Sequence, residues 1–271
     1  MRKWRILAVV AAVSVGLPIQ AQAPAFDAAS VKRATEPGGY MGAQPGGRFT
    51  AKGVSLQDLL VFAYDVQPYQ IVGGPAWLDV DRWDVTAAGA PEPRASTLLA
   101  LQQLLGDRFS LAVRRETREM PVYALTLARG DGRLGPGLKR SDFDCEAAQA
   151  EARRTRVVAP EARTRCFANG RVGSIQMGGT SMSVLAPMLS TRLQRTVVDR
   201  TGLTGPWDLT LTYRPEIAAG AAAPNSAPST VDPNAPSLFT AVQEQLGLKL
   251  ESTRAPVPVL VIDRAEFARE N

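Results

Sequence analysis

The sequence contains no histidine among its 271 residues and only two cysteines. Without imidazole, the chain cannot form Ser-His-Asp or Cys-His nucleophilic sites, histidine metal sites or a histidine pH switch. Two thiols are too few for a four-thiolate zinc site or an iron–sulfur cluster. Aromatic residues make up only 6%, but 45% of the residues are hydrophobic, enough for one large domain or two ordinary ones. No cofactor is expected from these counts.

The N-terminus has the pattern of an export signal. Basic residues in the first five positions precede an apolar run over residues 6–15, and small residues follow. We predict a signal peptide over residues 1–23; the alternative is an uncleaved N-terminal anchor. The run is shorter than the ~20 residues of a membrane-spanning helix, and no later segment is long enough either. Three cleavage positions stay open: Ala21, Ala23 and Ala25.

The positive charge of the chain lies largely in this signal. The net charge is +5, and Arg2, Lys3 and Arg5 supply three of these charges. The mature chain would therefore carry only a small positive charge, which creates no strong field for a polyanion. We expect an exported protein, periplasmic or secreted, with no nucleic-acid partner and no membrane span after signal removal. The oligomeric state stays open.

Cys145 and Cys166 are all the thiols of this chain. An even count in an exported protein favours a disulfide, and closing a loop of this length would contribute roughly 3 kcal/mol. The intervening segment is charged and rich in Ala and Arg, and residues 146–156 have helical composition without an apolar stripe. We interpret it as a stapled surface insertion. The alternative is two free or catalytic thiols.

Two blocks of the sequence recur in the same order, which suggests an internal duplication. Residues 48–87 resemble residues 173–213, and residues 96–111 resemble residues 237–250. Trp83 and Asp84 in the first copy correspond to Trp207 and Asp208 in the second. The predicted organisation is a first copy at 26–129, a cysteine-bracketed connector at 130–170, and a second copy at 171–265 with a Pro/Ala-rich loop at 215–236.

Each copy is predicted to be a small sheet with two helices over one face, which makes the fold class α+β. In the first copy, the helix after Ser96 is expected to end at Gly106, a residue suited to a helix C-terminus. Each copy is then expected to close with an antiparallel hairpin. The predicted hairpin strands are 111–116 with 122–127, and 248–253 with 257–262.

Several stretches together resemble a family of exported, soil-associated bacterial proteins, expanded in acidobacteria and classed as a domain of unknown function. The matching stretches are 26–32, 75–77 with 82–85, 104–109, 115–123, 201–208 and 261–263. Family members often carry a histidine where this chain has Arg114. Related domains also occur attached to membrane metallopeptidases of the β-lactam-sensor type. By analogy, the resemblance implies a sensing or interaction role, and it supplies no established activity.

Paired carboxylates are the main enzymatic candidates that remain. A glycosidase needs two carboxylates ~5–9 Å apart with different pKa values. Asp84 and Asp208 occupy equivalent positions in the two copies, which favours a structural role such as capping a turn. Asp79 and Asp81 form an Asp-x-Asp pair that lacks the spacing of an EF-hand, so no metal site is expected.

The aromatic and basic residues supply the candidate binding positions. Trp83 and Trp207 recur in register, which favours core packing, whereas Trp77 follows a Gly-Gly-Pro turn where an exposed ring could anchor a peptide or glycan. Tyr69 and Arg114 are further candidate binding residues.

The sequence favours a non-enzymatic binding or sensing module of the cell envelope. Small duplicated sheets suit the addition of a partner strand, so a protein or peptide partner is expected at a sheet edge or in a groove between the copies. The alternative is a carboxylate-dependent hydrolase of an envelope or extracellular polymer.

Overall fold

The computed structural model describes residues 24–36, 38–89, 94–215 and 234–269. The predicted signal peptide and most of the predicted loop 215–236 lie outside these ranges. The chain divides into two compact units. Unit 1 comprises residues 1–64, 77–111 and 266–271; unit 2 comprises residues 65–76 and 112–265. Among the described residues, no helix is both long and apolar enough to cross a membrane.

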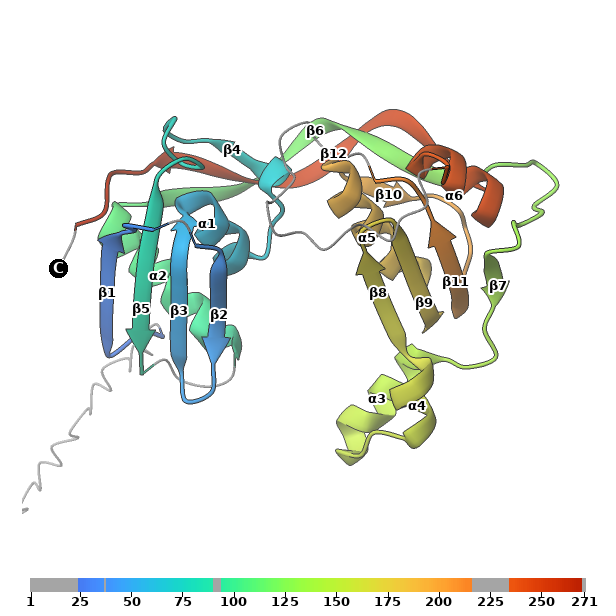
Figure 1. Ribbon diagram of the computed structural model, residues 1–271, viewed down its shortest axis with the longest axis horizontal. Helices are drawn as coiled ribbons and strands as arrows, with labels where there is room; N and C mark the ends of the chain where they lie inside the picture. Colours follow the sequence, from blue (N-terminus) through green and yellow to red (C-terminus); the bar gives the residue numbers. More distant parts are fainter. Residues whose placement is uncertain (1–23, 37, 90–93, 216–233, 270–271) are drawn as a thin grey trace, which may run out of the picture. The chain divides into compact units, whose positions relative to one another are not determined.

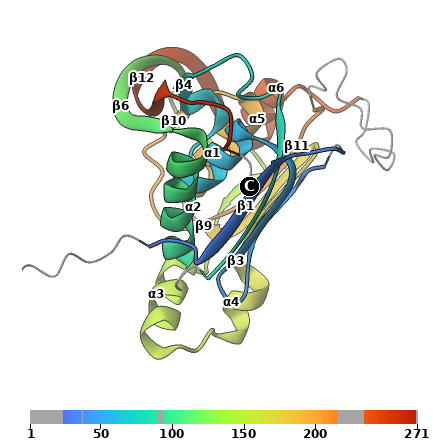
Figure 2. The ribbon, with the colours of Figure 1, turned by 90° about the vertical axis from the view of Figure 1, so that its left-hand side faces the viewer.

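Unit 1 is a four-stranded antiparallel sheet with helices over one face. Its strand order is β1-β5-β3-β2, and α1 and α2 cover the apolar side (Figures 1 and 2). Alternating residues of the strands, including Phe49 and Val85, are fully buried beneath Leu59 and Leu105 of the helices. The elements are β1 (Ala28–Arg33), β2 (Tyr40–Gln44), β3 (Arg48–Ser55), α1 (Leu56–Tyr64), β5 (Arg82–Ala88) and α2 (Arg94–Phe109).

Unit 2 contains a second four-stranded sheet of the same kind, in the order β7-β11-β9-β8. Buried residues of α5 and α6, including Leu185 and Val242, pack on Ile175 and Leu209 of this sheet. Pro187 lies inside α5. The elements are β7 (Leu138–Arg140), β8 (Phe167–Arg171), β9 (Ser174–Thr180), α5 (Met182–Leu193), β11 (Trp207–Thr212) and α6 (Leu238–Leu246).

The third sheet joins the ends of the two predicted copies within unit 2. Its order is β10-β6-β12-β4, and β6 pairs with β12 antiparallel along nearly their whole lengths. The two short strands at its edges pair in parallel, β10 with β6 and β4 with β12. A 3-10 turn (Pro68–Gln70) precedes β4. The strands are β4 (Ile71–Gly73), β6 (Ala112–Leu127), β10 (Val197–Asp199) and β12 (Leu248–Arg264).

The predicted hairpins at 111–116/122–127 and 248–253/257–262 are wrong. Each pair of expected strands is one continuous strand, β6 or β12, and the two long strands pair with each other. Charged and proline residues lie in the middle of each segment. The ribbon accommodates those residues because its middle has solvent-exposed positions, which do not have to pair with a further strand.

The predicted end of the second helix at Gly106 is also wrong. Helix α2 continues to Phe109, which is fully buried. Ser110 then adopts a left-handed conformation, with φ 46°, and ends the helix. In the second copy Gly247 does the same with φ 69°. Burial of Phe109 therefore outweighs the weak helix propensity of a glycine within the helix.

The region between the cysteines forms two helices, α3 (Cys145–Thr155) and α4 (Pro160–Arg165), which extend from the end of β8 and β9 (Figure 1). The predicted helix at 146–156 is confirmed. Asp144 caps α3, because its carboxylate accepts a hydrogen bond from the N–H of Ala147 at 3.0 Å. Cys145 and Cys166 form the expected disulfide.

The first and second sheets repeat one local arrangement. The strand before the first helix contains a glycine at φ +59°, Gly53 in β3 and Gly179 in β9. The N–H of each glycine donates to an aspartate on the neighbouring strand, Asp84 at 2.9 Å and Asp208 at 2.8 Å. These matched contacts support the internal duplication, which itself stays an interpretation of the sequence.

Candidate functional site

The open face of the second sheet carries a concavity of about 490 Å³ within unit 2. Its floor consists of residues that alternate outward from the strands, because α5 and α6 take the other face. Gln176 of β9, Thr210 of β11 and Lys139 of β7 are exposed there, and Asp208 is half-buried. An amide, a hydroxyl, an ammonium and a carboxylate therefore meet on one surface.

The edge of this concavity is built by the disulfide-bonded segment. Thr164 and Arg165 of α4 and Phe167 of β8 line it. The Arg165 guanidinium pairs with Asp142 and lies over the Phe143 ring at 5.0 Å, so it is held in place. These contacts make the insertion a rim of the site as well as a surface element.

Asp84 and Asp208 have the structural role expected from their equivalent positions. Each carboxylate accepts the N–H of a bulge glycine, and Asp84 also pairs with Lys52 at 3.0 Å. The hydrogen bond from Gly53, with a smaller contribution from Lys52, lowers the pKa of Asp84. Asp84 therefore stays ionised at neutral pH, unlike a general acid.

The tryptophans lie inside the fold. Trp83 is 1% exposed and meets Phe109 edge-on at 5.1 Å, and Trp207 is 5% exposed. Trp77 is half-buried, with its ring stacked on Phe267 at 4.6 Å. The Trp77 ring, predicted as an anchor for a peptide or glycan, therefore packs within unit 1.

The candidate Tyr69 is engaged within unit 2. It lies in the 3-10 turn before β4 and is half-buried. Burial raises the pKa of the Tyr69 phenol, against the smaller lowering effect of its hydrogen bonds with the side chains of Ser190 and Thr196. These contacts join the turn to the end of α5 and the approach to β10.

The candidate Arg114 belongs to an exposed charged cluster on β6 and β12. Its guanidinium pairs with Glu116 and with Asp263, the latter at 3.1 Å. Arg118 pairs with the same Glu116 at 2.8 Å. The cluster is a solvent-exposed face held by ion pairs.

The Glu116 carboxylate is expected to titrate near pH 2. Hydrogen bonds from Arg118 and Arg114 lower its pKa from 4.5 to about 2. Because the pKa is depressed in the folded state, the stabilisation is present above about pH 4.5 and is lost as the pH falls towards 2. Carboxyl chemical shifts followed by NMR test this. In Arg118→Gln the midpoint should rise; an unchanged midpoint would contradict the assignment.

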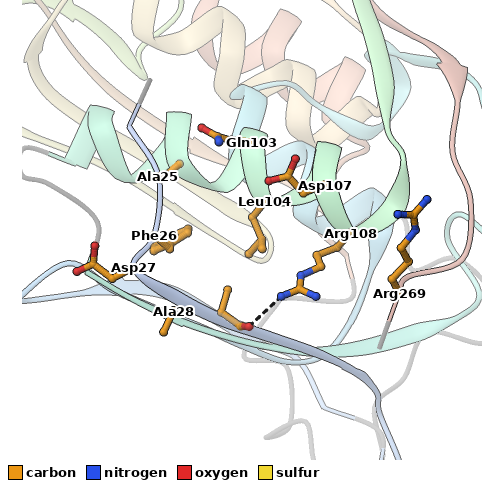
Figure 3. A pocket seen from close by; sticks show the side chains of 11 residues that line it. Ala25, Phe26, Asp27, Ala28, Gln103, Leu104, Asp107, Arg108 and Arg269 are labelled. Atoms are coloured by element: carbon orange, nitrogen blue, oxygen red, sulfur yellow. Dashed lines mark hydrogen bonds between the residues drawn. The ribbon is translucent and has the colours of Figure 1, made fainter. Parts of the chain in front are cut away.

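A second concavity, of about 380 Å³, lies in unit 1 between β1 and α2 (Figure 3). Gln103, Asp107 and Arg108 of α2 line it, together with the residues that lead into β1. Arg108 donates to the backbone carbonyl of Ala29 at 3.2 Å, so its guanidinium ties the helix to the edge strand. This contact gives Arg108 a structural role at the site.

Prolines interrupt the outer edges of the long ribbon formed by β6 and β12. The Tyr123 N–H donates to the Thr196 carbonyl, outside the ribbon, and the Pro258 carbonyl accepts from the Gln70 side chain, also outside it. These two contacts fix which residues of β6 and β12 direct their backbone groups away from the ribbon. By this alternation Pro121, Pro256 and Pro258 all occupy outward positions. Prolines there remove the donors that another strand would need.

The edge strand β8 has the opposite character. All five of its residues are exposed, and a two-residue turn joins it to β9 after Arg171. The turn makes Arg171 and Ser174 the closing hydrogen-bonded pair, so the backbone groups of Ala168 and Gly170 point outward. Strand β2 ends the first sheet in the corresponding place.

Within the described residues, no group of three or more acidic, cysteine or histidine side chains is arranged to hold a metal ion.

A family model with the description "Protein of unknown function (DUF3738)" matches residues 57–265. The chain belongs to this family. This agrees with the resemblance to a domain of unknown function drawn from the motifs. No curated protein and no solved structure matches the chain.

Sequence reasoning missed Lys139, Gln176 and Thr210. The signal for two of them is the alternation of polar residues with buried Ile175, Met177, Leu209 and Leu211 in β9 and β11. Strand β7 has only three residues and gave no such signal.

Proposed function

We propose that this chain is an exported, non-enzymatic binding module of the cell envelope that takes an extended peptide segment of a partner protein at strand β8. The observation that carries the proposal is the free edge of β8, where two residues direct their backbone groups outward. A partner strand can satisfy such groups by main-chain hydrogen bonding, as in other strand-addition complexes.

The charge pattern favours a partner with acidic residues. Along the open face of β8, Arg171 follows Asn169 and Phe167. An acidic side chain of an added strand would meet the Arg171 guanidinium. The ring of Phe167, 39% exposed, offers an apolar contact on the same face.

The positions of the carboxylates favour a binding module over a hydrolase. Asp84 and Asp208 hold bulge glycines, and Glu116 is shared by two arginines. A hydrolase would need two carboxylates in one cleft with separated pKa values. The concavity on the second sheet has one lining carboxylate, that of Asp208.

The proposal is tested by removing one outward donor. Ala168→Pro removes the outward N–H of β8 and leaves its ladder to β9 in place, and Ala168→Val is the matched control that keeps the N–H. Random displayed peptides would be selected against the wild type, and their affinity measured by calorimetry. We expect selected peptides to bind Ala168→Pro at least about tenfold more weakly and Ala168→Val about as well as the wild type.

Amide exchange supplies a second readout. On addition of a selected peptide, the amides of Ala168 and Gly170 should become protected in the wild type. Equal binding to Ala168→Pro, or protection confined to other strands, would overturn the assignment to β8.

A further inference from the structure

The concavity on the second sheet carries a glycine at the position where the first sheet carries a lysine. In the first sheet Lys52 precedes the bulge glycine, and its side chain crosses the open face to pair with Asp84 at 3.0 Å. In the second sheet the corresponding residue is Gly178, which lines the concavity. A Cβ at Gly178 would lie 2.3 Å from the Arg165 carbonyl oxygen and 2.7 Å from the Phe167 ring. A side chain therefore has no room at Gly178, and the pairing of Lys52 with Asp84 has no counterpart from this position of the second sheet.

The polar side chains on the floor of the concavity lie in opposite pairs that suit hydrogen bonding to a polyol. Lys139 and Asp208 are directly opposite on β7 and β11, so an ammonium donor and a carboxylate acceptor stand side by side. Asp208 lines the concavity, and its Oδ1 accepts the Gly179 N–H at 2.8 Å. Gln176 and Thr210 are opposite neighbours in the next row and can each donate and accept.

We propose that this concavity binds a sugar residue of a polysaccharide through adjacent hydroxyl groups. Lys139 would donate to one hydroxyl while Asp208 accepts from its neighbour, and Gln176 and Thr210 would bond the next hydroxyls along the ring. The exposed ring of Phe167 at the rim supplies a surface against which the carbon-bound face of a sugar can lie. The volume of about 490 Å³ is within the range of small-molecule sites.

The lining fits this ligand class better than an apolar or a strongly anionic one. An apolar ligand would leave the four polar floor groups without partners, at a cost for each. A phosphate would meet the Asp208 carboxylate, and the Arg165 guanidinium is already paired with Asp142. A ligand that is itself both donor and acceptor satisfies all of these groups.

The test uses two oligosaccharide probes, neutral cellohexaose and an acidic galacturonate hexamer, whose binding to the full chain is measured by calorimetry. Both carry adjacent hydroxyls, and the acidic arm reports whether Lys139 also selects a sugar carboxylate. We expect Lys139→Ala and Gln176→Ala to weaken binding of whichever probe binds by at least about tenfold. The matched controls in the first sheet, Lys32→Ala and Thr50→Ala, should bind like the wild type.

The outcomes separate this proposal from strand addition. Ala168→Pro should retain sugar binding, and Lys139→Ala should retain peptide binding. Failure of both probes to bind the wild type, or an equal loss in the first-sheet controls, would overturn the sugar site. Circular dichroism of each variant verifies that the fold is intact. Lys139, Gln176 and Lys32 are exposed and Thr50 is half-buried at the surface, so folding should be unaffected.

Discussion

Replacing Trp83 by alanine is expected to lower the free energy of unfolding of unit 1 by about 3–5 kcal/mol. The indole is 1% exposed and contacts Phe109 edge-on at 5.1 Å, while Arg33 lies over its ring at 5.7 Å. Truncation removes buried apolar surface and leaves a cavity under α2. The surrounding strands β1 and β3 are hydrogen-bonded on both sides of β5, so they cannot collapse into it.

The indole N–H sharpens this prediction. The Nε1 atoms of Trp83 and Trp207 are buried without a hydrogen-bond partner in the described part of the chain. Trp83→Phe therefore removes volume without orphaning a partner, and it should cost clearly less than Trp83→Ala.

Urea unfolding followed by amide exchange of β3 and β5 measures the loss within unit 1. Trp77→Ala is the matched control, because its ring is half-buried and stacked on Phe267 rather than enclosed. Trp77→Ala should lower the free energy of unfolding by less than Trp83→Ala does. If Trp77→Ala and Trp83→Ala lowered the free energy of unfolding by similar amounts, the placement of Trp83 at the centre of the unit 1 core would be contradicted.

Local patterning was enough to predict a small sheet with two helices over one face in each copy. The helices and the buried tryptophans follow from spacing and recurrence that each segment carries in its own sequence. The long ribbon was not predictable in this way. Pairing of β6 with β12 joins residues more than a hundred positions apart, and such pairings leave no periodic signal in either strand.

The candidate site shows the same division. Asp208 was singled out because it recurs, but its two roles, holding Gly179 and lining the concavity, depend on which strands are neighbours. Lys139 joins it only because β7 pairs with β11. The contrast between Lys52 and Gly178 becomes meaningful once both are known to precede a bulge glycine on an open face.

Removing the disulfide is expected to destabilise unit 2 by about 3 kcal/mol in the double variant Cys145→Ser, Cys166→Ser, because the unfolded chain regains the freedom of the closed loop. Cys145 is also 1% exposed, and a Cβ at Gly179 would lie 2.6 Å from its sulfur, so the bridge is packed directly on the bulge that holds Asp208. Thermal unfolding of the double variant measures the loss, with the exposed α3 substitution Ala147→Ser as control.

The position of the disulfide also predicts which part of the double variant becomes less stable. Arg153 and Arg163 lie on the two helices that the disulfide ties to β8, so trypsin should cut the double variant there first. Unit 1 does not contain the loop and should keep its exchange pattern.

Alkylation of exported, unreduced wild-type protein should find no free thiol; two modified cysteines would contradict the bridge. Because Arg165 and Phe167 flank Cys166 and line the concavity, loss of the bridge should weaken sugar binding even where Lys139 and Gln176 are intact.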